Sequence, residues 1–264
     1  MKVYLSADIE GTAGIVDWSE TTADHPQYAY FQQQMTKEVA AACRGALDAG
    51  AAEILVKDAH GGARNIIPTM LPEQAKLFRG WDCSPEMMMA GIDESFDGVI
   101  FTGYHAAAGT SSNPLAHTMS LKIQSITCNG RLMSEFDINA LIAAHYGVPV
   151  YFLSGDAGLC RAAREVTNIH TVATNEGRDS GAITMHPNAA VEQIRESVSH
   201  ALTQPKQEYL YPVAPYYQIE VCYKEHIPAA KAANYPGVIR KDAKTVCLEA
   251  VDFMEIIRAF FFIL

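Results

Sequence analysis

The sequence contains none of the short motifs that mark several large enzyme classes. Gly-x-Ser-x-Gly does not occur, which excludes the nucleophile elbow of an α/β-hydrolase. The glycines between Glu10 and Gly14 lack the spacing of a dinucleotide-binding fingerprint, and no Gly-Lys-Ser/Thr of a phosphate-binding loop is present. A catalytic centre in this chain therefore has to be sought in other residue types.

Basic residues are few, and long hydrophobic runs are absent. The 264-residue chain has 20 Lys and Arg against 30 Asp and Glu, which gives a net charge of -10. Nucleic acids and anionic membranes are bound by clustered Lys and Arg, and this sequence has no such cluster. The apolar run 256–264 is too short to span a bilayer and contains Arg258. We expect neither a nucleic-acid nor a membrane partner, and we expect this run to form a helix packed on the core or in a subunit interface.

No Cys-x-x-Cys pair occurs among the six cysteines, which are Cys43, Cys83, Cys128, Cys160, Cys222 and Cys247. The first strand-like segment begins at residue 2, so no signal peptide is expected. Scattered cysteines in a chain of this size are expected to be reduced thiols, most of them small buried hydrophobes. These features favour a cytoplasmic location.

Strand-like and helix-like segments alternate along the chain, as they do in α/β folds. This alternation predicts a mainly parallel sheet with helices on both faces. Strands are predicted at 2–8, 53–58, 98–104, 148–153 and 171–174, and helices at 28–49, 134–145 and 187–202.

A linker with three prolines, 203–215, predicts a change of subdomain. We expect a metal-binding catalytic α/β domain at 1–204 and a small C-terminal α+β subdomain at 214–264. Within the first domain, Asn129-Gly130 lies between two strand-like runs and predicts a β-hairpin.

Carboxylate and imidazole side chains gather just past the ends of three predicted strands. Asp8 and Glu10 follow the first strand two residues apart, so both point to the same side of it. Like charges placed in this way are costly unless a cation neutralises them. Asp58 and His60 follow the second strand, and His105 follows the third. Because ligands bind outside the carboxyl ends of the strands in open α/β sheets, these five residues predict a metal site.

Each residue also has a structural interpretation when it is considered alone. Asp8 can cap a turn, Asp58 can cap a helix, and a single histidine after a strand is more often structural than catalytic. Glu135 is predicted in the first turn of a helix, where the helix dipole favours an acidic residue. His117 can be an ordinary loop histidine. The coincidence of three segments at one edge of the sheet favours the metal site over these alternatives.

The residue types also indicate which metal is bound. Mixed imidazole and carboxylate ligands suit zinc, manganese or iron, and zinc is the usual choice for hydrolysis. A catalytic tetrahedral zinc takes three protein ligands and a water molecule, so five ligands are too many for one ion. Two metals that share a carboxylate use all five, and such a pair activates water near neutral pH.

The opening hexapeptide, Ser6-Ala7-Asp8-Ile9-Glu10-Gly11, resembles the Ser-x-Asp-x-Glu-Gly signature of the DppA-like zinc D-aminopeptidases. The resemblance continues in order through Asp58-Ala59-His60-Gly61, Gly103-Tyr104-His105-Ala106, Ala116-His117-Thr118-Met119-Ser120 and the Glu135 helix with Asn139. Weaker matches follow at 236–240, 245–246 and 258–260, so the resemblance covers nearly the whole chain.

The resemblance implies a ligand set for two zinc ions per chain. Asp8 would bridge the two ions. Glu10 and His60 would complete one site, and His105 and Glu135 would complete the other.

The resemblance further implies a catalytic residue and an assembly. His117 would lie beside the metals as general base, general acid or oxyanion stabiliser. The chain would form a ring-like homo-oligomer with its sites facing an inner cavity. Ser134 and Asp137 stand where family members often carry glycine, so the helix start and the substrate wall are expected to differ from those of the family.

We therefore predict a dinuclear zinc aminopeptidase that hydrolyses short peptides with a D-amino acid at the amino end. One alternative is a metal-dependent amidase or phosphoesterase that acts on other small substrates. The acidity of the chain and the absence of Arg from the site motifs count against a phosphate substrate. The other alternative is a non-catalytic metal-binding protein, which a mixed five-ligand site with an additional histidine disfavours.

Overall fold

The alternating segments form a seven-stranded sheet in a computed structural model that describes all 264 residues. Its strands run in the order β3-β2-β1-β4-β7-β8-β9, and all are parallel except β9, which pairs antiparallel with β8. Their bounds are β1 (Lys2–Ala7), β2 (Glu53–Asp58), β3 (Ala75–Phe78), β4 (Gly98–Tyr104), β7 (Val150–Asp156), β8 (His170–Arg178) and β9 (Gly181–Thr184). The predicted α/β class is confirmed.

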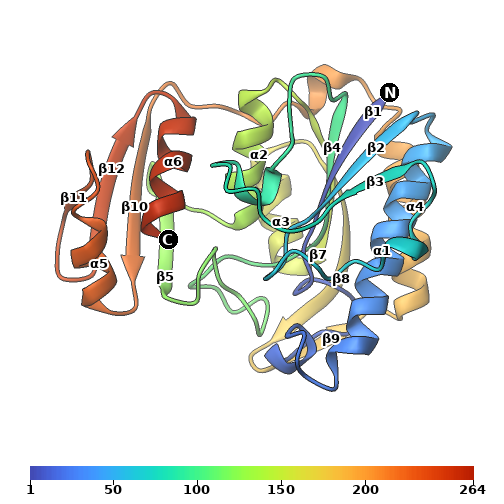
Figure 1. Cartoon of the computed structure of the whole chain (residues 1–264), viewed down its shortest axis with the longest axis horizontal. Helices are drawn as coiled ribbons and strands as arrows, with labels where there is room; N and C mark the ends of the chain where they lie inside the picture. Colours follow the sequence, from blue (N-terminus) through green and yellow to red (C-terminus); the bar gives the residue numbers. More distant parts are fainter.

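Helices cover both faces of this sheet, as predicted (Figure 1). On one face, α1 (Tyr28–Asp48) and α4 (Pro187–Ala201) share a hydrophobic core with alternate residues of β1, such as Val3 and Leu5. On the other face, α2 (Glu135–His145) and α3 (Ala157–Val166) share a core with Tyr4. This alternation follows from the two-residue period of strands. None of the helices is both long enough and apolar enough to cross a membrane.

A second, antiparallel sheet forms a lobe beside the first, in the strand order β11-β12-β10-β5-β6. Its strands are β10 (Tyr217–Tyr223), β11 (Ile239–Arg240), β12 (Thr245–Ala250), β5 (Ile123–Cys128) and β6 (Arg131–Leu132), and its helices are α5 (His226–Ala232) and α6 (Phe253–Ile263). Four short helices complete the chain: η1 (Trp18–Glu20), η2 (Pro68–Met70), η3 (Met87–Met89) and η4 (Lys206–Tyr209).

The hairpin predicted at Asn129-Gly130 is confirmed, because β5 pairs with β6 across it. Both turn residues have positive φ, 50° and 81°, as a two-residue hairpin loop requires. The same hairpin joins the C-terminal lobe: β5 pairs with β10, and one continuous core extends from α2 into the lobe. The lobe therefore contains more than the expected segment 214–264, since residues from the middle of the chain complete its sheet.

The carboxyl ends of β1 and β4 lie unusually close together. The Asp8 N–H donates to the Thr102 carbonyl at 2.9 Å, and the Gly11 N–H donates to the Gly103 carbonyl at 2.8 Å. Gly103 has φ 69°, and a Cβ there would lie 2.2 Å from the Asp8 carbonyl oxygen. This backbone contact fixes the segment that carries Asp8 and Glu10 against the end of β4.

Candidate metal site

Asp8 lies between two imidazole rings because β1 lies between β2 and β4. Its Oδ1 is 3.3 Å from Nδ1 of His60, which follows β2. Its Oδ2 is 3.4 Å from Nε2 of His105, which follows β4. The two oxygens of one carboxylate thus face two different histidines, as a bridging ligand requires.

A second carboxylate completes the group on each side of Asp8. On one side, Glu10 Oε2 lies 3.1 Å from His60 Nδ1. On the other, Glu135 Oε2 lies 3.4 Å from His105 Nε2. Glu135 is the first residue of α2, whose start is fixed by Ser134 and its capping box.

These groups fit a metal better than they fit one another. Zinc bonds of about 2.1 Å in tetrahedral geometry place two ligand atoms about 3.4 Å apart, close to the separations observed here. Glu10 Oε2 and His105 Nε2 are buried and have no hydrogen-bond partner. Buried polar atoms are rarely left unpaired, so an additional group is needed between them. A cation coordinated by these atoms meets that need.

Each of the three site histidines has one ring nitrogen held by a backbone carbonyl and the other directed at carboxylates. The holding contacts are His60 Nε2 to Thr21 O at 3.0 Å, His105 Nδ1 to Ala106 O at 3.0 Å, and His117 Nδ1 to Leu115 O at 2.9 Å. A carbonyl only accepts, so the held nitrogen carries the proton. The nitrogen that faces the site is thereby left free to bind a metal or accept a proton.

The electrostatics of the site favour positive charge. Burial by itself would raise the pKa of Asp8, but contact with His105 and His60 holds this pKa well below its usual range. Burial by itself would lower the pKa of both histidines, yet neighbouring carboxylates raise both pKa values well above the usual range. Glu10 and Asp8 do so for His60, and Glu135, Asp8 and Glu10 do so for His105. Three buried carboxylates thus create a strongly cation-binding environment.

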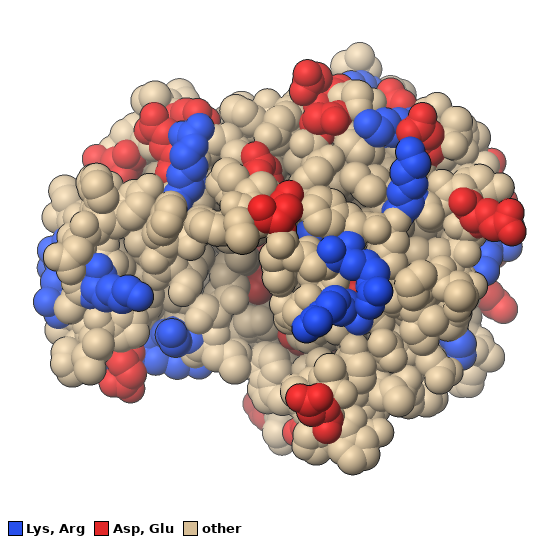
Figure 2. All heavy atoms as spheres, in the orientation of Figure 1, with Lys and Arg blue, Asp and Glu red and all other residues tan.

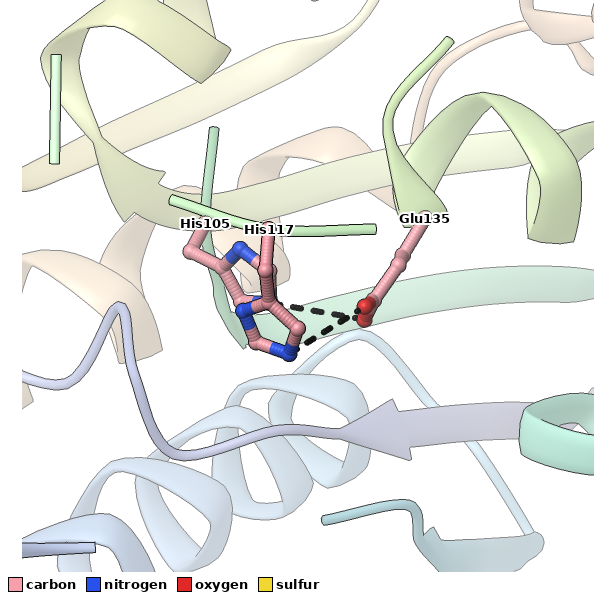
Figure 3. Close-up of side chains that lie close together, drawn as sticks. All are labelled: His105, His117 and Glu135. Carbon is pink, nitrogen blue, oxygen red and sulfur yellow. Dashed lines mark ion pairs between the residues drawn. The ribbon is translucent and has the colours of Figure 1, made fainter. Parts of the chain in front are cut away.

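His117 lies beside this group, on the Glu135 side (Figure 3). Its ring stacks on that of His105 with centroids 4.2 Å apart, and its Nε2 is 3.6 Å from Glu135 Oε1. Atoms of His105, His117 and Glu135 that could bind a metal all lie within 4.8 Å of one another. Trp18 packs against His117 in an edge-to-face arrangement, with ring centroids 5.3 Å apart. His117 is therefore placed either to bind a metal or to move a proton next to one.

The structure brings six of the seven candidate residues together and separates Asp58 from them. Asp58 accepts hydrogen bonds from the backbone N–H groups of Asn65 and Ile66, at 2.6 and 2.8 Å. The Asn65 side-chain amide in turn donates to the His60 carbonyl at 2.7 Å. Asp58 thus holds the loop that carries His60. The carboxylate that lies beside the His105 imidazole is that of Glu135.

A cavity of about 260 Å³ opens onto the site. Four of its walls are apolar residues, Trp18, Trp81, Met88 and Met119, and of these only Met119 lies in a sequence motif named above. Met88 belongs to the Met87–Met89 run, which is otherwise part of the core. These walls come from loops distant in sequence, and their apolar character alone does not distinguish them from core residues.

The chain is similar to known proteins along nearly its whole length. The chain is 31% identical over 264 residues to the D-aminopeptidase of Bacillus subtilis (strain 168), covering 98% of this chain and 95% of that protein. Its fold matches a solved structure, the Zn-dependent D-aminopeptidase DppA from Bacillus subtilis, a self-compartmentalizing protease. The TM-score is 0.91 at 29% identity, with 98% of this chain and 95% of that one covered. The family model described as peptidase M55, D-aminopeptidase, matches residues 1–262, and the chain belongs to this family.

Proposed function

We propose that this chain is a dinuclear zinc aminopeptidase that hydrolyses short peptides with a D-amino acid at the amino end. The observation that carries the proposal is the position of Asp8 between two imidazole–carboxylate groups. The family and the zinc dependence of its solved relative support the same conclusion.

In this proposal Asp8 bridges the two ions. Glu10 and His60 hold one ion, and His105 and Glu135 hold the other. The two unpartnered buried atoms support this division, because one, Glu10 Oε2, lies on the first side and the other, His105 Nε2, lies on the second. His117 is left outside the two groups, beside Glu135, with its Nε2 3.6 Å from Glu135 Oε1.

When bound, such a metal pair would polarise the scissile carbonyl and make a water molecule nucleophilic near neutral pH. His117 would handle the proton. Its Nδ1–H is held by Leu115, so its Nε2 can accept a proton from the attacking water and return it to the leaving amine. Trp18 packs against the His117 ring, with centroids 5.3 Å apart, and helps to hold it in place.

The lining of the cavity favours an amide over a phosphate ester. It contains no Lys or Arg that could bind a phosphate, and its polar groups are carboxylates and imidazoles. A non-catalytic metal site is disfavoured because the ligands open onto a cavity with an additional histidine directed into it.

The proposal is tested by zinc content and by a panel of dipeptides. Protein dialysed against zinc and then against metal-free buffer should retain two zinc ions per chain. It should hydrolyse D-Ala-Gly and D-Ala-D-Ala faster than L-Ala-Gly, and it should not hydrolyse phosphate monoesters. One zinc or none would contradict the bridged pair. Two zinc ions without hydrolysis of any dipeptide would favour a metal-binding protein.

We also propose a ring-like homo-oligomer and a cytoplasmic location. The name of the solved relative describes it as self-compartmentalizing, which supports an assembly for this chain too. Exposed Ile227, Ile239 and Val251 of the C-terminal lobe provide apolar surface that an assembly could cover. The six free cysteines are compatible with a reducing compartment. Light scattering of the purified protein gives the subunit number, and a monomer would contradict the ring.

A further inference from the structure

A second cavity, of about 360 Å³, lies directly beside the metal cavity. We call it the apolar pocket. It is lined by Trp81, Asp82, Cys83, Ser84, Met87, Met119, Phe260, Phe261 and Leu264. Trp81 and Met119 line both cavities, so the two cavities are adjacent and share these walls.

The apolar pocket is formed by two segments distant in sequence. The segment 81–87 supplies one wall, and the last turn of α6 with Leu264 supplies the other. Phe260 is buried under the pocket, whereas Phe261 remains 40% exposed. Figure 2 shows the surface hollowed between the lobe that carries α6 and the body of the molecule. Asp82 is the only charged residue in the lining, and it is itself exposed.

Both shared walls are attached to residues of the metal site. The Trp81 indole N–H donates to the carbonyl of Gly61, next to His60, at 2.9 Å. The Met119 N–H donates to Glu135 Oε1 at 2.6 Å, and Met119 takes a strained positive φ of 62°. The apolar pocket therefore has a fixed position relative to the metal ligands.

Lys57 fixes the Trp81 wall from behind. Its ammonium lies 4.1 Å from the centroid of the Trp81 ring, within the range of a cation–π contact. The same ammonium donates to the carbonyls of Asp58 and Gly80, at 2.7 and 2.8 Å. Lys57 is fully buried, so these contacts hold the ring in place and do not reach a ligand.

We propose that the apolar pocket binds an apolar side chain of the peptide substrate, from one of the two residues that flank the scissile bond. This inference rests on the proposed function and adds a substrate preference to it. A ligand whose carbonyl lies in the metal cavity can extend a side chain past Trp81 and Met119 into the apolar pocket, because these two residues line both cavities. The volume is at the small end of ligand cavities, about 300–1,000 Å³, and suits one side chain of the size of Leu or Phe.

The first test compares substrates that differ in one side chain. D-Leu-Gly against D-Ala-Gly varies the residue before the scissile bond, and D-Ala-D-Leu against D-Ala-D-Ala varies the residue after it. In one of the two pairs, the Leu peptide should have a kcat/KM at least about tenfold higher, since even one buried methylene is worth about 10-fold in discrimination and Leu is larger than Ala by more than that. Equal values in both pairs, or a preference for Ala in both, would overturn the inference. Failure of all four peptides would instead count against the proposed function.

The second test shortens the wall. Phe261→Ala should lower the Leu-to-Ala ratio of kcat/KM about fivefold in the pair that shows the preference. Phe262→Ala is the matched control, because Phe262 is the next residue of α6, is 67% exposed and stacks on Tyr235 outside the pocket. The control should keep the wild-type ratio. An unchanged ratio in Phe261→Ala, with or without a change in subunit number, would assign this wall to another role.

A binding measurement separates recognition from turnover. D-leucine hydroxamate should bind the zinc-loaded wild type more tightly than D-alanine hydroxamate if the residue before the scissile bond enters the pocket, and Phe261→Ala should reduce this difference. If the preference lies at the residue after the bond, the two ligands compared are instead the products D-leucine and D-alanine. Calorimetry gives both affinities, and an identical difference in the two proteins would contradict the inference.

Cys83 provides an independent probe, since it is exposed in the pocket lining. A bulky maleimide attached there should depress hydrolysis of the preferred Leu peptide more than that of its Ala counterpart. In Cys83→Ser the ratio of treated to untreated rates should not depend on the peptide. If treatment of the wild type depresses both peptides equally, the pocket does not hold the substrate side chain.

Discussion

A methyl group on Gly11 would lie 1.8 Å from the carbonyl oxygen of Tyr104. Gly11 follows Glu10, and Tyr104 precedes His105, so this contact joins the two segments that carry metal-site residues. Two backbones can approach this closely only if one of them has no side chain. The glycine of the opening signature is therefore needed for backbone proximity, separately from any conformational freedom.

Gly11→Ala should disturb both the fold and the site. The clash is with backbone, which cannot move aside cheaply, so we expect a loss of about 3 kcal/mol in the free energy of unfolding. Displacement of Glu10 should also lower zinc occupancy. Gly62→Ala is the matched control, because a Cβ there meets only the flexible Arg64 guanidinium at 3.4 Å. Urea unfolding and zinc analysis measure the two effects, and equal stability of the two variants would refute the steric argument.

Substitution of single ligands should remove zinc in unequal numbers. Asp8→Ala should lose both ions, because its two oxygens face the two groups. Glu135→Ala should lose only one ion, from the His105 side. Asp48→Ala alters a carboxylate in an exposed ion pair with Arg195 and should keep both. Zinc per chain after dialysis distinguishes the three variants, and full occupancy in Glu135→Ala would remove Glu135 from the ligand set.

His117→Ala should keep both zinc ions and lose most of its activity. A positioned acid or base is worth about 10²–10⁴-fold in rate, and we expect kcat to fall within that range. His145→Ala is the control for the loss of an imidazole elsewhere. His145 lies at the surface, and its partner Asp252 is 3.7 Å away. Steady-state kinetics with parallel zinc analysis decides the matter. A loss of zinc in His117→Ala would show that His117 is a ligand, and an unaltered kcat would exclude it from catalysis.

Glu38 should make stability depend on pH. Burial in α1 raises the pKa of its carboxyl from 4.5 to about 7. Between these values the folded protein holds a proton that the unfolded chain has released, so the free energy of unfolding falls as pH rises through this window. The pKa difference corresponds to about 3 kcal/mol.

Glu38→Gln should flatten this part of the pH profile. The amide oxygen can still accept from the Ala13 N–H and the Gln34 side chain, which both lie 3.0 Å from Glu38 Oε1. Urea unfolding at pH 5 and pH 8 should show that the wild type loses about 3 kcal/mol more than the variant over this interval. Parallel profiles of the two proteins would show that Glu38 does not titrate in this range.

The elements of the fold follow from local sequence patterns, and the arrangement of the site does not. The alternation of strand-like and helix-like segments placed the main strands and helices within a few residues of their observed bounds. The position of Asp8 between His60 and His105 depends on the strand order β2-β1-β4, which no local pattern specifies. The short strands β9 and β11 were also not predictable, because they are defined by pairing with β8 and β12.

The position of an acidic side chain in the structure can also differ from the one that the sequence pattern predicts. Asp58 and Glu135 are both acidic residues at the boundary of a predicted element, and pattern alone favours Asp58 because it follows a strand. The hydrogen bonds of Asn65 and Ile66 hold Asp58 in its own loop. Only the packing of α2 against the sheet brings Glu135 to His105. Among the sequence-based arguments, only the resemblance to the family placed Glu135 beside His105.

Met1 and Leu264 lie near opposite ends of the strands of the large sheet. The carbonyl of Met1 accepts from the Ala52 N–H at the amino end of the large sheet, whereas Leu264 lines the apolar pocket beside the carboxyl end of that sheet. An affinity tag fused after Leu264 would begin at the wall of the apolar pocket and could block the entry of a substrate side chain. A tag fused before Met1 would begin on the far side of the sheet. Purified protein for the substrate measurements should therefore carry its tag at the amino end.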